Sequence, residues 1–110
     1  MPGPVVRPAR VVNLHRDAYD VYGGRPGKGQ TGFWGNPFSW RKGTPPEFLV
    51  ANREEAISKH KPWFRAQPEK MRRLPELAGQ RIGCFCRPAR CHGDNYLDFL
   101  EELGYPVIRN

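Results

Sequence analysis

The chain has 110 residues, 38% of them hydrophobic, and 18 lysines and arginines exceed 11 aspartates and glutamates to give a net charge of +7. This length predicts a single domain with one modest hydrophobic core. No apolar run is long enough to cross a membrane. The first residues lack the apolar stretch of a secretory signal, so we expect a cytoplasmic protein.

The positive charge is carried mostly by arginine, with thirteen arginines against five lysines. The arginine guanidinium binds phosphate through two parallel hydrogen bonds, which lysine cannot make. This bias favours an anionic partner: a nucleic acid, a nucleotide or a phosphorylated metabolite. The alternative is an ordinary basic surface without a specific ligand. Nothing in the composition indicates an oligomeric state.

The beginning of the chain divides into an arm and a first pair of strands. Residues 1–10 contain three prolines and two arginines, and we expect them to form an extended basic arm. The apolar and β-branched residues that follow predict a strand over 11–15 and a second over 20–22. The remaining chain, residues 11–110, is expected to form the domain.

A glycine-rich segment, residues 23–37, carries Arg25, Lys28 and Trp34. It does not have the spacing of a Walker-type phosphate loop, because Gly29 follows Lys28 where that motif has serine or threonine. A loop with these side chains still suits the binding of an anion or the stacking of a base. The alternative is a surface loop that buries one tryptophan.

Two helix starts lie close together in the middle of the chain. Thr44 with Glu47 predicts the first start and Asn52 with Glu55 predicts the second. The region 45–66 should therefore form one long helix or two short ones. Helical spacing places four residues on one face: Ala56, Ile57, His60 and Phe64.

The second half of the chain continues the alternation of helices and strands. Pro62 should bend or end the preceding helix because proline lacks the N–H that a helix interior needs. A further helical turn over 71–77 should stop at Gly79. The last expected elements are a strand over 81–84, a helix over 94–103 ending at Gly104, and a strand over 107–108. This order predicts an α/β fold, a small single-domain sheet with flanking helices and long loops rich in glycine and proline.

All the cysteines of the chain fall within eight positions, at Cys84, Cys86 and Cys91, and His92 follows directly. In an extended segment Cys84 and Cys86 face the same side. Cys91 and His92 lie at the start of the last helix, where the helix dipole stabilises a thiolate. Asp94 is placed to cap that helix or to orient His92.

Three interpretations of this cluster are open. Cys84, Cys86, Cys91 and His92 are suitable ligands for zinc or, through the three thiolates, for an iron–sulfur cluster. Alternatively, Cys91 is an activated thiol with His92 as its base. In the third interpretation the cysteines are buried packing residues. The metal site is favoured because closely spaced intracellular cysteines are more often ligands than packing residues.

Four short motifs resemble those of an uncharacterised family of small bacterial and phage proteins, a domain of unknown function. The family motifs are V-N-L, G-N-P-F, C-W-C and C-H-G-D, and they correspond here to residues 12–14, 35–38, 84–86 and 91–94. Phe85 replaces the usual tryptophan, and His15 precedes the expected arginine. The resemblance implies no known activity, but it implies that Asn13, Arg25, Asn36 and the cysteines belong to one site.

Several other residues are weighed as candidates. Asn36 precedes a proline and is held extended, so its amide is expected either to contact a ligand or to stabilise a turn. Trp34, Trp40 and Trp63 are expected to be packing residues, with Trp34 the best candidate for stacking on a base. Arg87 and Arg90, beside the cysteines, are expected to add positive charge to the site.

Together these features predict a small metal- or iron–sulfur-binding enzyme that acts on a nucleotide or nucleic acid. Cys91, His92 and Asp94 are the expected catalytic residues. The residues expected to bind the anionic ligand are Asn13, Arg25, Lys28, Trp34, Asn36, Arg87 and Arg90. The alternatives are a nucleic-acid-binding module with a structural metal and a phage-type inhibitor of a host protein.

Overall fold

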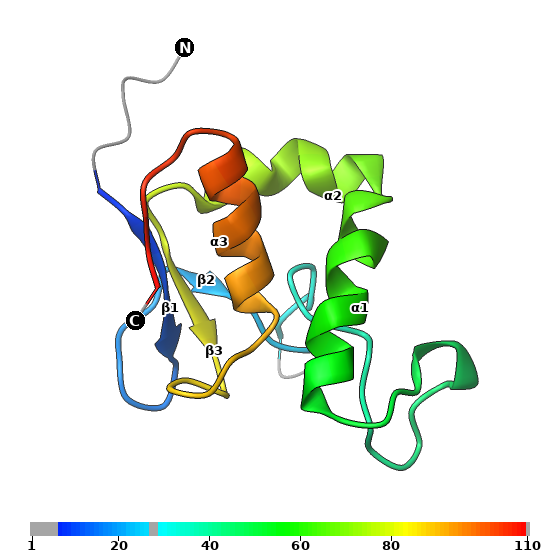
Figure 1. The fold of residues 1–110 in the computed structure, drawn as a ribbon. Coiled ribbons are helices and arrows are strands. Elements are labelled where there is room, and N and C mark those ends of the chain that lie inside the picture. Colours follow the sequence, from blue (N-terminus) through cyan, green and yellow to red (C-terminus); the bar gives the residue numbers. More distant parts are fainter. Residues whose placement is uncertain (1–6, 27–28, 110) are drawn as a thin grey trace.

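The computed structural model describes residues 7–26 and 29–109 and contains one four-stranded sheet. Its strands are β1 (Ala9–Asn13), β2 (Val21–Tyr22), β3 (Arg81–Cys84) and β4 (Val107–Ile108). The strand order is β2-β3-β1-β4 and every neighbouring pair is parallel. A loop joins β1 to β2, whereas helices join β2 to β3 and β3 to β4 (Figure 1). The predicted α/β fold is therefore confirmed.

The first strand begins earlier than expected. β1 starts at Ala9 instead of at residue 11, so residues 9 and 10 of the expected arm belong to the sheet. Ala9 is fully buried, which explains why the strand extends to it. Of the rest of that arm, residues 7 and 8 precede the strand, and residues 1–6 lie outside the described part of the chain.

The pairing of β1 with β3 aligns the ends of both strands. Val11 is paired with Ile82 and Asn13 with Cys84, and Val21 of β2 is also aligned with Ile82. Because these three strands are parallel, their carboxyl ends lie at the same edge of the sheet. Ligands bind at this edge in most open parallel sheets.

The helical elements are the 3-10 turn η1 (Pro46–Phe48), α1 (Arg53–Arg65), α2 (Pro68–Arg73), the 3-10 turn η2 (Leu74–Leu77) and α3 (Gly93–Glu102). The second predicted start begins the main helix, because Asn52 Oδ1 accepts a hydrogen bond from Glu55 N at 2.9 Å. The first predicted start gives only a three-residue turn. Pro62 lies in the last turn of α1.

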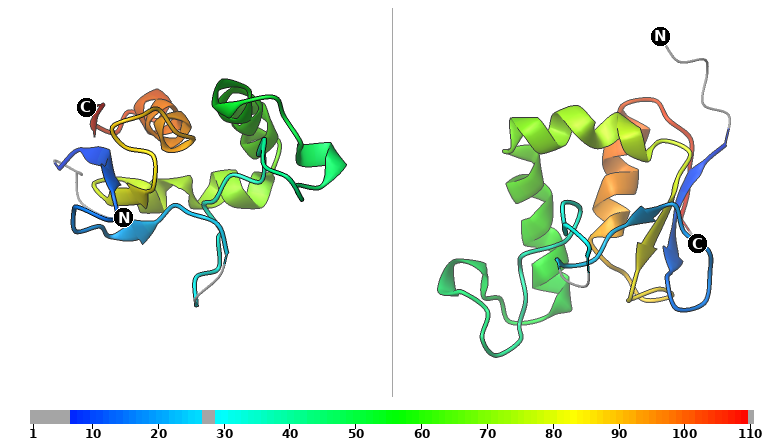
Figure 2. Two further views of the ribbon diagram at one scale, coloured as in Figure 1. Left: turned by 90° about the horizontal axis from the view of Figure 1, so that it is seen from below. Right: turned by 180° about the vertical axis from the view of Figure 1, so that it is seen from behind.

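The core lies between the sheet, α1 and α3, with α3 crossing in front of the sheet and α1 beside it (Figures 1 and 2). Phe64 of α1 packs against Tyr96 and Phe99 of α3, with ring centroids 5.0 and 5.7 Å apart. The predicted buried face of α1 is confirmed, since its buried residues are Ala56, Ile57, His60 and Phe64. Within the described residues, no helix has the length and apolar character needed to cross a membrane.

Candidate functional site

A cavity of about 790 Å³ lies at the carboxyl edge of the sheet. Part of its lining is the residues that directly follow the strands: Leu14 and His15 after β1, Gly23 and Gly24 after β2, and Phe85 and Cys86 after β3. The other part comes from Arg25, Pro26 and Gln30 of the glycine-rich loop, from segment 36–41 and from the start of α1. We call it the strand-end cavity. It also contains Cys84, Cys91 and His92, so the cysteine motif opens into it.

Two of the cysteines are in direct contact. Cys91 Sγ donates a hydrogen bond to Cys84 Sγ across 3.3 Å, and both side chains are almost fully buried. This hydrogen bond, with those from backbone N–H groups of the following loop, lowers the pKa of Cys84. The same bond raises the pKa of Cys91, because its proton is the one donated. The sequence predicted a thiolate at Cys91, whereas within this pair the pKa is lowered at Cys84 and raised at Cys91.

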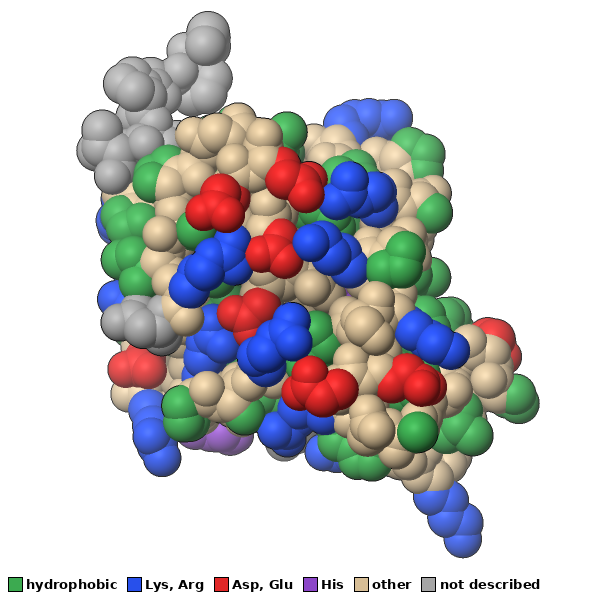
Figure 3. Space-filling model, in the orientation of Figure 1, with side chains coloured by type: hydrophobic (Ala, Val, Ile, Leu, Met, Phe, Trp, Pro, Cys, Tyr) green, Lys and Arg blue, Asp and Glu red, His purple; other side chains and the backbone are tan. Residues whose placement is uncertain are grey.

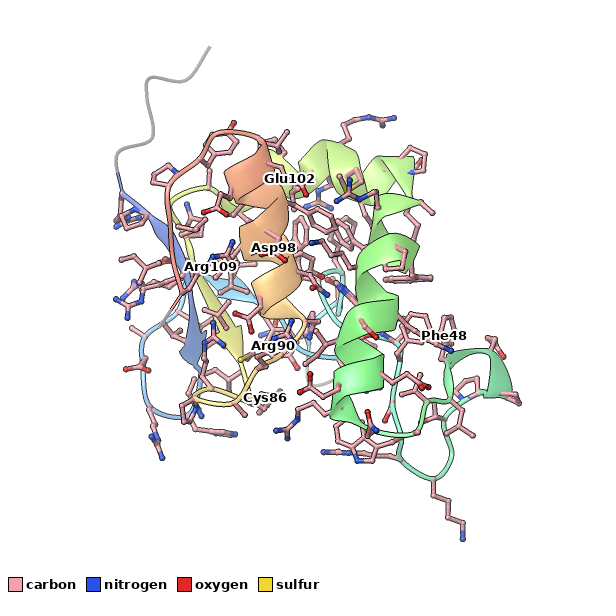
Figure 4. All side chains as sticks on the ribbon, viewed as in Figure 1. Phe48, Cys86, Arg90, Asp98, Glu102 and Arg109 are labelled. Atoms are coloured by element: carbon pink, nitrogen blue, oxygen red, sulfur yellow. The ribbon has the colours of Figure 1, made fainter. Side chains whose placement is uncertain are left out.

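The third cysteine, Cys86, lies on the loop between β3 and α3, residues 85–92 (Figure 4). It lines the same cavity. Cys86 is half-buried, and burial raises its pKa, as does the neighbouring charge of Cys84. All three cysteines therefore line one cavity, and two of them, Cys84 and Cys91, have their sulfur atoms in contact.

The ring of His92 is held by the backbone of two other segments. Its Nε2 lies 2.8 Å from Gly23 O and 2.9 Å from Trp34 O. Carbonyl oxygens only accept hydrogen bonds, so Nε2 carries the proton and Nδ1 is the basic nitrogen of the neutral ring. Burial lowers the pKa of His92. The neutral form is therefore present at neutral pH.

A second histidine lies behind His92, with ring centroids 5.0 Å apart. His60 Nδ1 accepts a hydrogen bond from Asn95 Nδ2 at 3.0 Å, and its Nε2 lies 3.3 Å from Tyr96 Oη. Burial, with the nearby His92 and Lys70, lowers the pKa of His60 to about 2. His60 is a neutral core residue, as expected for a histidine on the buried face of α1.

The described residues supply part of a metal site. Tetrahedral zinc with Zn–S bonds of about 2.3 Å holds two thiolates about 3.8 Å apart, and the Cys84–Cys91 pair is near that separation. His92 Nε2 is committed to two carbonyl groups, so Nδ1 is the ring nitrogen of His92 left to bind a metal. No group of three or more His, Cys, Asp or Glu side chains in the described chain is arranged to hold one ion. The pair fits as two ligands, and the complete predicted set is not assembled.

Arg87 and Asp94 form a nearly buried ion pair, with side chains 10% and 14% exposed. Arg87 Nη1 and Nη2 donate to the two Asp94 oxygens at 3.0 and 2.6 Å, and Asp94 also accepts from Cys91 N at 3.1 Å. Burial opposes ionisation of Asp94, but these hydrogen bonds outweigh it and lower its pKa. Both side chains thus hold the β3–α3 loop against α3, and neither lines the strand-end cavity.

The two predicted asparagines also bond to the backbone. Asn13 Nδ2 donates to Arg87 O at 2.6 Å, which ties the end of β1 to the β3–α3 loop. Asn36 lines the cavity, but its Nδ2 donates to Ala56 O at 3.0 Å and its Oδ1 accepts from Phe38 N at 2.9 Å. Asn36 therefore stabilises its turn, the second of the two roles weighed from the sequence.

Three arginines line the strand-end cavity, namely Arg25, Arg41 and Arg53. Only Arg25 was predicted from the sequence, and it donates to Phe38 O at 3.3 Å. None of the three has a carboxylate within ion-pair distance in the described structure. No aspartate or glutamate is found among the described residues that line the cavity.

The other predicted cations lie elsewhere. Arg90 pairs with Glu54 at 3.3 Å on the groove between α1 and α3, where Figure 4 labels it. That face of the molecule alternates basic and acidic side chains (Figure 3). Arg109 and Asp98 form one of its ion pairs, at 2.7 Å. Lys28, predicted to bind the anion, lies outside the described residues.

The prediction that the tryptophans are packing residues is confirmed for Trp34 and Trp63 and is wrong for Trp40. Trp34 is 6% exposed and packs against Phe64 and Tyr96 in the core, so its ring is too enclosed to stack on a base. Trp40, expected to be a packing residue, is 41% exposed and lines the cavity, as does Phe85 at 52%. Phe85 stands at the tryptophan position of the family motif, which was the one sequence signal for an aromatic here.

These features define a small parallel α/β domain with a basic cavity that contains thiols at the carboxyl ends of its strands. The chain belongs to the family described as Domain of unknown function (DUF4326), whose model matches residues 6–102. This confirms the family resemblance inferred from the motifs.

A relative in Enterobacteria phage T4 is described as "Uncharacterized 12.4 kDa protein in nrdA-td intergenic region". It is 35% identical to this chain over 99 residues, which cover 90% of this chain and 83% of the phage protein. No solved structure matches the chain.

Proposed function

We propose that the protein binds the phosphate of a nucleotide in the strand-end cavity. The observation that carries this proposal is the lining itself: Arg25, Arg41 and Arg53, with no carboxylate among the described lining residues. Three like charges around one cavity repel each other, and an anion relieves that repulsion. Arginine is also the side chain best suited to hold phosphate through paired hydrogen bonds.

The contrast with the rest of the surface strengthens the argument. On the face over α1 and α3, Lys61, Arg65 and Arg109 each lie within 3.1 Å of a carboxylate oxygen. An exposed ion pair of this kind contributes little stability, but it neutralises the local charge. The cavity concentrates positive charge that is not neutralised in this way.

The aromatic lining favours a nucleotide over inorganic phosphate. His15, Tyr22, Trp40 and Phe85 all line the cavity. Bases stack on aromatic rings regardless of sequence. A ligand that carries both a phosphate and a base would use both parts of the lining.

Titration calorimetry with thymidine monophosphate, thymidine and inorganic phosphate tests the proposal. We expect the monophosphate to bind more tightly than either fragment. Arg53→Gln should weaken its binding about 10- to 150-fold, since a hydrogen bond to a charged group contributes about 1.5–3 kcal/mol.

Arg72→Gln is the matched control, because Arg72 is an exposed arginine of α2 outside the cavity lining. Equal losses in the two variants would mean that only the net charge matters. Failure of all three ligands to bind would refute the proposal.

A second candidate function, an enzyme with a metal or cluster at the cysteines, is favoured by one observation: the 3.3 Å separation of Cys84 Sγ and Cys91 Sγ at the cavity. Zinc there would supply a Lewis acid, and a cluster iron would supply an open site for the substrate. Elemental analysis and a visible spectrum of protein purified without air distinguish zinc, iron–sulfur and free thiols.

One variant, Cys84→Ser, distinguishes a catalytic role of the cysteines from a structural one. If the cysteines take part in a reaction, Cys84→Ser should abolish turnover of the bound nucleotide and leave its binding within about threefold of the wild type. If the metal is only structural, as in a nucleic-acid-binding module, the substitution should instead reduce the free energy of unfolding. Protein that contains neither zinc nor iron would refute the metal proposal.

A further inference from the structure

The strand-end cavity is larger than one base and one phosphate require. Its volume of about 790 Å³ lies in the upper part of the range of about 300–1,000 Å³ typical of small-molecule sites. Its lining includes both the sheet edge and segment 36–41, and we call these two parts of the lining its walls. The volume leaves room for a second base.

Exposed aromatic rings stand on both sides of this cavity. Phe85 directly follows β3 at the sheet edge, and Trp40 lies on segment 39–50, which leads into α1. In Figures 1 and 2 the loop after β3 and segment 39–50 lie on opposite sides of the first turn of α1. Phe85 therefore belongs to the wall at the sheet edge, and Trp40 belongs to the wall formed by segment 36–41.

Both rings are positioned by neighbours and are still accessible. Trp40 has the guanidinium carbon of Arg53 5.9 Å from its ring centroid. Phe85 is flanked by Tyr22 and His15, with ring centroids 6.4 and 5.2 Å away. Yet 41% of Trp40 and 52% of Phe85 are exposed to solvent. Exposed aromatic side chains gathered at a cavity mark a binding surface.

Arginines accompany the two rings. Arg53 is the first residue of α1 and lies against Trp40, and Arg41 follows Trp40 in the chain. Arg25 lies three residues after the end of β2. Its carbonyl oxygen accepts a hydrogen bond from Tyr22 Oη at 2.8 Å. Aromatic platforms on two walls with cations in the same cavity match a ligand that has two bases joined through phosphate.

We propose, building on the function proposed above, that the ligand carries two nucleobases joined through phosphate, with one base on Trp40 and the other on Phe85. Such a unit occurs in two consecutive nucleotides of a single strand and in a pyrophosphate-linked dinucleotide. Both sources share the chemistry that the cavity recognises.

The test compares pTpT with thymidine diphosphate, because both carry two phosphates and only the first carries two bases. Stacking on an aromatic side chain contributes about 5- to 150-fold in affinity per base. We therefore expect pTpT to bind more tightly than the diphosphate by a factor in this range, as measured by calorimetry and by quenching of tryptophan fluorescence.

Trp40→Ala and Phe85→Ala should each reduce the affinity for pTpT to that for the diphosphate, whereas Trp40→Phe should retain most of it. Leu103→Ala is the matched control, since Leu103 is 54% exposed at the end of α3 and does not line the cavity. Circular dichroism checks that all variants are folded.

Two further ligands identify the source. Tighter binding of oligothymidylate than of pTpT would indicate a single-stranded nucleic acid, and tighter binding of NAD would indicate a pyrophosphate-linked dinucleotide. If pTpT and thymidine diphosphate bind equally, and Trp40→Ala affects neither, the two-base inference is refuted while phosphate binding stands. If no nucleotide binds, the proposed function fails as well.

Discussion

Replacing Asp94 by asparagine tests the ion pair that fixes the β3–α3 loop at the start of α3. The substitution keeps the size of the side chain and its acceptor for Cys91 N, but it removes the charge opposite Arg87. The guanidinium, 10% exposed, is then left nearly buried without a counter-ion. Breaking a buried pair in this way costs about 3–5 kcal/mol. The residual exposure of both partners places the expected loss near ~3 kcal/mol.

Urea denaturation measures this loss as a change in the free energy of unfolding at constant m-value. A loss of about 3 kcal/mol is a large part of the total of about 5–15 kcal/mol typical of a small domain. Asp98→Asn is the matched control, because Asp98 lies one turn further along α3 and its ion pairs with Lys61 and Arg109 are about one-third exposed or more. It should cost less than about 1 kcal/mol. Equal losses for the two variants would contradict the reasoning.

The pair also predicts a pH dependence. The folded-state pKa of Asp94 lies below its ordinary value, so the stabilisation is complete above the ordinary pKa of aspartate near 3.8 and disappears as the pH falls through the lowered value. The difference in stability between wild type and Asp94→Asn should therefore shrink in acid. A difference that is constant down to about pH 2 would show that the charge of Asp94 is not responsible.

Three further predictions concern the core and its loops. Because the pKa of His60 is lowered from 6.5 to about 2, the unfolded chain binds a proton that the folded chain excludes, and stability falls as the pH drops below 6.5. His60→Gln should reduce this fall by up to about 2 kcal/mol between pH 6.5 and pH 5. Identical pH profiles of the stability of the two proteins would contradict this prediction. Gly93→Ala would place a Cβ 2.8 Å from Val11 Cγ2. This crowding should lower the melting temperature by an amount equivalent to about 1–3 kcal/mol. An unchanged melting temperature would mean that α3 moves away from β1 without cost. Asn36→Ala removes the bond to Ala56 O at 3.0 Å and should cost about 1–3 kcal/mol in urea, with an unchanged unfolding midpoint as the contradicting result.

Most of the fold could be predicted from local sequence patterns. The strand over 81–84 and the strand over 107–108 form as expected, and the last helix differs from the prediction by one residue at each end. Asn52 sets the start of α1 through its own side chain, and the four residues of the buried face of α1 follow from helical spacing. These features depend on neighbours in the chain, so the sequence is sufficient to predict them. The helix start predicted at Thr44 gives only the three-residue turn η1. Val50, which follows this turn, packs in a small hydrophobic cluster with Phe38.

The contact between the sulfurs of Cys84 and Cys91 was also predictable, because the residues are close in the chain and the loop between them turns back on itself. The sequence could not predict which cations face the cavity. Arg90 does not line the cavity but forms an ion pair with Glu54, which is distant in the chain. Arg87 likewise forms an ion pair with Asp94. Arg53 lines the cavity because the first turn of α1 forms part of its wall.

The sequence by itself determined the α/β alternation, the family and the clustering of the thiols, since each depends on local spacing or on a short motif. Only the tertiary structure decided that Trp34 is a core residue and that Trp40 and Phe85 line the cavity. It also decided that the pKa of Cys84 is lowered, through the contact with Cys91 and the backbone N–H groups of the following loop. The reason is physical: burial, the partner of a charge and the direction of a proton donor depend on segments that meet only when the chain folds.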